Sequence, residues 1–145
     1  MDNFKLETIN SEPSAEDRKV IVDGMIAYHA SKGHIRKEKD DYFSIVIKNQ
    51  KHKTLGAIVV SCRWGAMHIE TLWIDEVIRN KGWGTKLMNL VEQEAVKRNC
   101  YLIYTDTLSW QAPQFYEKLG YVLYGKLDDF PRGCFLSYYV KRLKK

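Results

Sequence analysis

A turn that contains two glycines could bind a phosphate group. Gly82 and Gly84 lie in a cationic run from Arg79 to Thr85, a few residues after the apolar residues 72–74. Glycine lets the backbone approach a ligand closely. If a helix begins at this turn, its first amide N–H groups have no intrahelical acceptor and lie at the positive end of the helix dipole. This combination predicts a site for phosphate oxygens.

The segments on either side of the turn must position it. Residues 66–75 are too apolar for a loop and predict a strand. After the turn, apolar residues recur at helical spacing as far as Asn99, where the predicted helix ends. These apolar residues are Leu87, Met88, Leu90, Val91 and Ala95. Strand, glycine turn and helix thus follow one another as a phosphate-binding crossover requires.

The spacing of the glycines narrows the choice of ligand. A dinucleotide fingerprint needs a third glycine where Leu87 and Met88 stand, and the Gly-Lys-Ser/Thr of a nucleoside-triphosphate loop is absent. The remaining pattern, Arg-x-x-Gly-x-Gly from Arg79 to Gly84, resembles the acetyl-CoA signature of the GNAT superfamily of N-acetyltransferases. A second segment, Ala112 to Tyr121, resembles the family's signature Ala-x-x-Phe-Tyr-Glu-Lys-x-Gly-Phe. The two signatures stand in the family's order and at its separation.

The resemblance implies that acetyl-CoA is the co-substrate. Backbone amides of residues 80–85 are expected to hold its pyrophosphate, and the strand before them its pantetheine arm. Arg79 and Lys81 could add charge or could be ordinary surface residues, and Ser109 stands where the family often has asparagine. The expected cofactor-binding residues are Leu72, Trp73, Ile74, Arg79, Asn80, Lys81, Gly82, Trp83, Gly84, Thr85 and Ser109.

Transfer to an amine needs two proton-handling groups. A primary amine has a pKa near ~10.4, so its neutral form costs about 4–5 kcal/mol at pH 7, and a base or a desolvating cleft must supply this. The resemblance implies Tyr116 as the acid for the departing thiolate and Glu70 as the base. His68 shares the face of Glu70 on an extended strand and, like a water chain, is an alternative base. Asp106 could hold a cationic acceptor.

The order of predicted elements gives the fold class. We expect an α/β (α+β) fold with a mixed, mostly antiparallel sheet and a central parallel pair where strands 66–75 and 101–107 meet, as in the GNAT fold. The other predicted strands span residues 3–9, 42–48, 54–63, 121–127 and 134–140. The other predicted helices run from a Ser14 cap to Gly33 and from Gln111 to Leu119.

Length and composition limit the class of protein. A chain of 145 residues with 45% hydrophobic content predicts a single domain, 1–145. The net charge of +5 is scattered along the chain and does not favour nucleic-acid binding. The absence of a signal peptide and of an apolar run near ~20 residues predicts no membrane span and a cytoplasmic location. Three distant cysteines predict reduced thiols and no metal site.

The leading function is an acetyl-CoA-dependent N-acetyltransferase that transfers the acetyl group directly to a primary amine. A small-molecule acceptor is preferred over a protein amine, to be chosen by the loops Gly33–Asp41 and Asp128–Gly133. Cys134 is the cysteine that could support an acyl-enzyme route. The alternative is a non-catalytic CoA-binding regulatory or interaction module. The apolar last strand, Phe135 to Val140, could pair in a homodimer.

Overall fold

The computed structural model describes residues 3–36 and 41–144. The chain divides into two compact units, Met1–Lys37 and Glu38–Lys145, which are described separately. The predicted loop Gly33–Asp41 lies partly outside the described residues. None of the helices within them is long and apolar enough to cross a membrane.

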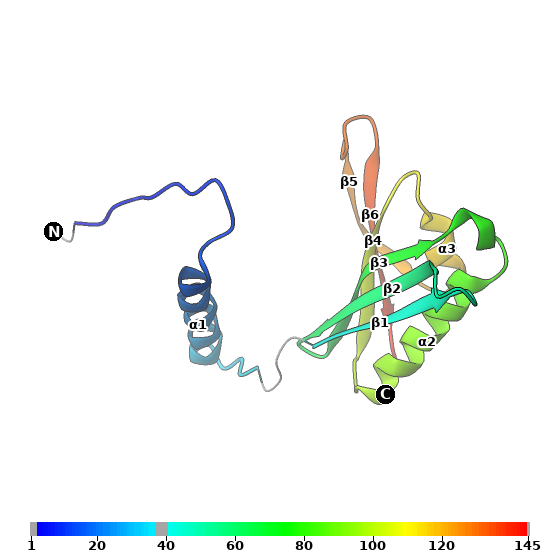
Figure 1. Ribbon diagram of the computed structural model, residues 1–145. Coiled ribbons are helices and arrows are strands. Elements are labelled where there is room, and N and C mark those ends of the chain that lie inside the picture. The colour runs from blue at the N-terminus through cyan, green and yellow to red at the C-terminus, as the bar shows by residue number, and fades with distance from the viewer. Residues whose placement is uncertain (1–2, 37–40, 145) are drawn as a thin grey trace. The chain divides into compact units, whose positions relative to one another are not determined.

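The first unit contains helix α1 (Ala15–Ser31), drawn in blue in Figure 1. Ser14 caps it, because its Oγ accepts a 3.0 Å hydrogen bond from the Asp17 amide, and Gly33 ends it at φ 84°. Both ends were predicted. The predicted strand 3–9 is wrong, because these residues form no regular structure and Phe4 and Leu6 are fully exposed. Alternating residues become a strand only when a partner strand completes their hydrogen bonds.

The second unit is built on a six-stranded sheet with the order β1-β2-β3-β4-β6-β5 (Figure 1). Its strands are β1 (Asp41–Lys48), β2 (Thr54–Arg63), β3 (Ala66–Ile74), β4 (Leu102–Leu108), β5 (Val122–Asp128) and β6 (Phe135–Arg142). β3 and β4 pair in parallel, and every other pair is antiparallel. The predicted fold class is therefore confirmed.

The position of β6 corrects one expectation. β6 lies between β4 and β5, so both of its edges carry sheet hydrogen bonds. The predicted pairing of Phe135–Val140 across a dimer is therefore wrong, because an interior strand has no free edge. The sequence could not reveal this, since strand order depends on the crossovers and not on the strand itself.

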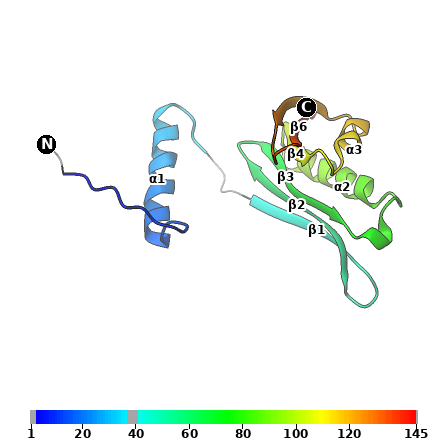
Figure 2. The same ribbon diagram turned by 90° about the horizontal axis from the view of Figure 1, so that it is seen from above.

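Helix α2 (Trp83–Lys97) connects β3 to β4 and lies against one face of the sheet (Figure 2). It buries Leu87, Met88, Val91 and Ala95, as its apolar spacing predicts, whereas Leu90 is 39% exposed and lies outside the buried stripe. The sheet residues of this core are Ile58, Val60, Met67, Ile69 and Ile103. Each fully buried aliphatic side chain contributes about 1.5–3 kcal/mol to folding. Helix and sheet are thereby fixed relative to each other on both sides of the glycine turn.

Candidate active site

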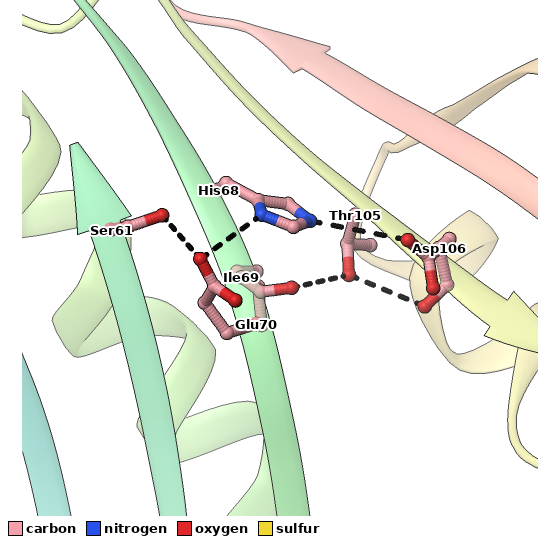
Figure 3. Close-up of polar contacts among 6 residues, drawn as sticks. All are labelled: Ser61, His68, Ile69, Glu70, Thr105 and Asp106. Carbon is pink, nitrogen blue, oxygen red and sulfur yellow. Dashed lines mark hydrogen bonds and ion pairs between the residues drawn. The ribbon is translucent and has the colours of Figure 1, made fainter. Parts of the chain in front are cut away.

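The parallel strands β3 and β4 pair over only three residues and then separate. Their register is Ala66 with Leu102, Met67 with Ile103 and His68 with Tyr104. Immediately beyond the last pair, the buried Thr105 donates a 3.1 Å hydrogen bond from Oγ1 to the Ile69 carbonyl (Figure 3). Past this contact no β3–β4 ladder pair joins the described residues of the two strands.

A β-bulge at Glu70 accompanies the separation. Val60 pairs with Ile69 and the adjacent Val59 pairs with Thr71, so Glu70 is an extra residue opposite β2. A bulge bends its strand and increases the local twist. The bend coincides with the end of the β3–β4 ladder, and it sets the direction of the Glu70 side chain.

A cleft of about 940 Å³ lies where the strands diverge. Glu70, Asp106 and Tyr116 line it, as do most of the predicted cofactor-binding residues. The latter are Leu72, Trp73, Ile74, Arg79, Asn80, Gly82, Trp83, Gly84 and Thr85. The structure thus brings residues of β3, the glycine turn, β4 and the segment around Tyr116 together at one cleft.

The glycine turn presents unpaired amides at one end of the cleft. Gly82 is the N-cap of α2, has φ 84° and makes no side-chain cap, and its carbonyl accepts from the Lys86 amide at 3.0 Å. The amides of residues 83–85 therefore precede the first intrahelical hydrogen bond. A Cβ built on Gly82 would meet no atom within 4 Å, so the turn is open to a ligand. These features suit an anion.

The side chains of Arg79 and Lys81 contact backbone carbonyls next to the turn. Arg79 Nε donates a 2.9 Å hydrogen bond to the Ile74 carbonyl, which fastens the turn to the end of β3. Lys81 Nζ lies 3.4 Å from the Val77 carbonyl. Arg79 lines the cleft, whereas Lys81 does not.

The loop between β4 and the short helix α3 (Pro113–Lys118) contributes residues that the motifs did not indicate. Ser109 is absent from the cleft lining, and its amide donates 2.9 Å to the Phe135 carbonyl. Trp110 and Gln111 of this loop line the cleft instead, together with Thr107 near the end of β4. Gln111 Oε1 accepts from the Leu108 amide at 2.8 Å and so fixes the loop. A polar residue shortly before Pro113 was the available signal for this turn.

Tyr116 projects from α3 to the base of the cleft. It is 6% exposed and its ring packs edge-on against Phe115 and Tyr121, at centroid distances of 5.2 and 5.8 Å. Burial raises the pKa of Tyr116, and a hydrogen bond with Thr105 partly offsets this rise. The hydroxyl is therefore a protonated donor at neutral pH.

Four side chains form a polar cluster on β2, β3 and β4, called here the His68 cluster (Figure 3). It consists of Ser61, His68, Glu70 and Asp106. Ser61 Oγ donates a 2.6 Å hydrogen bond to Glu70 Oε1, and this bond, aided by His68 and Arg63, holds the pKa of Glu70 below its usual range. His68 Nδ1 lies 3.4 Å from the same Glu70 oxygen, and His68 Nε2 lies 4.0 Å from Asp106 Oδ2.

The remaining sequence candidates lie apart from this chemistry. Cys134 does not line the cleft, and its amide donates 2.8 Å to the Pro131 carbonyl. All three cysteines are free thiols. Over residues 3–36 and 41–144, no group of three or more His, Cys, Asp or Glu side chains is placed to hold a metal ion.

Comparison with known proteins shows which family the chain resembles. Residues 7–121 match the model of the "Acetyltransferase (GNAT) family". The chain is 29% identical over 140 residues to "Acetyltransferase Atu2258" of Agrobacterium fabrum, covering 97% of this chain and 98% of the relative. It is 30% identical over 95 residues to the blasticidin-S acetyltransferase of Streptomyces morookaense, covering 65% and 70%. A crystal structure of a Bacillus cereus acetyltransferase superposes with a TM-score of 0.81 at 31% identity, covering 94% and 98%.

Proposed function

Because the chain belongs to the acetyltransferase (GNAT) family, we propose that it transfers an acetyl group from acetyl-CoA directly to a primary amine of a small molecule. The observation that carries this proposal is the continuity of one cleft. It joins the open amides of the glycine turn to Tyr116, Glu70 and Asp106 across the gap between β3 and β4. An anion site, a proton donor and two carboxylates therefore share one cavity.

The cofactor side of the cleft fits acetyl-CoA. The amides of residues 83–85 and the open space over Gly82 suit a diphosphate. Residues 72–74 line the cleft next to it and would lie along the pantetheine arm. Acetyl-CoA supplies an activated thioester when it is bound. Backbone N–H groups beside the strand gap would supply donors for the negative charge that develops on its carbonyl oxygen.

The proton chemistry is divided between two sides of the gap. The acceptor nitrogen bonds to the acetyl carbon, the carbon–sulfur bond breaks, and the sulfur takes a proton. Tyr116 is the proposed donor of that proton, because burial keeps its phenol protonated. The proton lost by the amine leaves toward the Glu70–His68 pair, whose side chains lie in contact. Direct transfer is favoured because Cys134 does not line the cleft.

A cationic small molecule is the proposed acceptor. Glu70 and Asp106 place two carboxylates at the cleft, which attract an ammonium group although the chain carries a net charge of +5. A volume of about 940 Å³ holds a small molecule beside the cofactor arm. One relative is named for acetylating blasticidin S, which supports an acceptor of this size. A protein amine is the less favoured acceptor. We also propose a cytoplasmic location.

The competing function is a CoA-binding module without turnover. The decisive experiment measures thiol release from acetyl-CoA with a panel of primary amines, including small polyamines, aminoglycosides and a lysine peptide. The proposal predicts amine-dependent release that is faster with cationic small molecules than with the peptide. Tight CoA binding without release for any amine would favour the module.

A further inference from the structure

We infer that His68 Nε2 is the atom that takes the proton from the acceptor amine, while Glu70 orients the imidazole and Asp106 binds the ammonium. This inference rests on the proposed acetyl transfer and assigns roles at the edge of the same site: Glu70 and Asp106 line the cleft, and His68 does not line it but contacts both carboxylates. It makes His68 a catalytic residue and Glu70 a positioning residue.

Glu70 is poorly suited to take the proton itself. Its Oε1 already accepts a 2.6 Å hydrogen bond from Ser61 and faces His68 Nδ1 at 3.4 Å. Both contacts stabilise the carboxylate, and the pKa of Glu70 is lowered accordingly, with the Ser61 bond as the largest cause. An ordinary glutamate is about 6 pKa units less basic than a primary amine, whereas an ordinary imidazole is only about 4 units less basic. A further lowered carboxylate widens the difference.

The contact with Glu70 determines which nitrogen of His68 is free. When Nδ1 carries the hydrogen and donates toward Glu70 Oε1, Nε2 presents a lone pair. The ring cannot turn freely, because it stacks on Tyr104 with a centroid distance of 4.6 Å and an interplanar angle of 13°. Nε2 therefore stays directed toward Asp106, as Figure 3 shows.

The gap between His68 and Asp106 has the properties of an ammonium site. Nε2 and Asp106 Oδ2 are 4.0 Å apart, and both are hydrogen-bond acceptors in this tautomer. Two acceptors attract a donor with several hydrogens, which a primary ammonium supplies. Such a group can donate to Asp106 and pass one proton to Nε2, leaving a neutral amine beside the strand gap.

The alternation of the strands separates this base from the proposed acid. On β4, Thr105 is buried and its hydroxyl acts on the pKa of Tyr116, while the next residue, Asp106, is exposed and faces His68. Successive side chains of a strand point to opposite faces. The proton removed from the amine and the proton delivered to the sulfur therefore travel on opposite faces of the sheet.

Other titratable groups surround the ring and are kept constant in the test. Glu70 on β3 and Asp106 on β4 are the two carboxylates that face its nitrogens. Tyr104 on β4 stacks on the ring, Arg63 on β2 acts on Glu70, and Tyr124 on β5 interacts with Asp106. Tyr138 on β6 is the register partner of Asp106.

The kinetic test follows kcat/KM for acetyl-CoA and the best cationic amine between about pH 5 and 9 in matched variants. His68→Gln is expected to lower kcat about 10²- to 10³-fold and to remove the rise of kcat/KM with pH. Glu70→Gln is expected to lower kcat less and to keep that rise, and Asp106→Asn is expected to raise KM for the amine. The control His52→Asn, in the turn between β1 and β2, should leave kcat, KM for the amine and the rise of kcat/KM with pH unchanged. If Glu70→Gln removed the rise while His68→Gln kept it, Glu70 would be the base and the inference would be overturned.

A second measurement needs no turnover and so separates this inference from the proposed function. Long-range ¹⁵N NMR of the histidine rings, with the His68 signal assigned by His68→Gln, reports which nitrogen carries the hydrogen. The inference requires the Nδ1–H tautomer in the neutral ring. A neutral ring with its hydrogen on Nε2 would contradict it, whatever the enzyme does with acetyl-CoA.

Discussion

Thr105 Oγ1 donates a 3.1 Å hydrogen bond to the Ile69 carbonyl across the point at which β3 and β4 part. Thr105 is 2% exposed, and its hydroxyl lowers the pKa of Tyr116 against the larger effect of burial. One buried hydroxyl thus connects the edge of the strand gap to the proposed acid.

Thr105→Val is therefore expected to act on both stability and catalysis. The valine has nearly the same shape but leaves the Ile69 carbonyl without its donor, which costs about 1–3 kcal/mol of unfolding free energy. Urea denaturation measures this loss, and kcat should fall with it. Thr105→Ser keeps the hydroxyl and should recover most of kcat. If valine and serine variants were equally active, Thr105 would have no part in positioning Tyr116.

Tyr116→Phe removes the proposed acid while keeping the aromatic packing with Phe115 and Tyr121. We expect kcat to fall about 10²-fold or more, with CoA affinity unchanged. Steady-state kinetics and calorimetry give the two quantities. Tyr42→Phe, which removes a hydroxyl from a side chain that is 62% exposed and does not line the cleft, is the control. Unchanged kcat in Tyr116→Phe would assign the tyrosine to packing alone.

Gly82→Ala places a methyl group in the open space above the turn and forces alanine to φ 84°. The conformational strain is about 1–2 kcal/mol, and CoA affinity should fall about tenfold or more because the turn must shift to relieve it. Gly33→Ala is a matched control, since Gly33 also has φ 84° with nothing within 4 Å of its added Cβ. It should lose similar local stability and bind CoA normally. Equal losses of CoA affinity in both variants would contradict the site.

Lys141→Met is expected to destabilise the second unit. Lys141 Nζ donates to Glu92 at 2.9 Å and to the Leu119 carbonyl at 2.9 Å, which ties β6 to α2 and to the end of α3. Its loss leaves Glu92 partly buried without its cation, at a cost of about 1–3 kcal/mol. Lys19→Met, which breaks the exposed helical pair with Asp23, should change stability little. Thermal unfolding distinguishes the two.

Alkaline pH should destabilise the fold through its buried tyrosines. Burial and then the hydrogen bond to Glu117 raise the pKa of Tyr139 to about 12, and burial likewise raises the pKa of Tyr121. Above about pH 10 the unfolded chain releases these protons while the native state keeps them, so the free energy of unfolding falls as pH rises. For Tyr139 the fall continues to about pH 12 and amounts to at most about 1.4 kcal/mol per pH unit.

Tyr139→Phe should make that fall shallower, and Tyr42→Phe, which changes a side chain that is 62% exposed, should not. Denaturation midpoints at pH 9, 10 and 11 provide the comparison. An identical slope in Tyr139→Phe and the unmodified chain would contradict the assignment.

Local patterns predicted most of the second unit. The alternating residues of β2 gave its bounds, and the glycine turn with the following apolar stripe gave α2. Residues 3–9 alternate similarly but form no strand. The difference lies in pairing with a distant segment, which no local pattern encodes.

Parts of the candidate site follow from local sequence signatures, and other parts depend on how the strands align. The glycine turn and Tyr116 follow from the two signatures. The bulge at Glu70 and the contact between Ser61 and Glu70 depend on how β2 and β3 align. The contact between His68 and Asp106 depends in the same way on how β3 and β4 align. Trp110 and Gln111 enter the cleft through a loop whose path depends on the β6 backbone.

The most direct measurement of the central claim is isothermal calorimetry of the folded protein with CoA and, separately, with pantetheine, which lacks the nucleotide and its diphosphate. If main-chain donors around Gly82 hold the diphosphate, CoA binds with measurable heat and pantetheine binds far more weakly. No heat from CoA at millimolar concentration, or equal affinity for the two, would contradict the account.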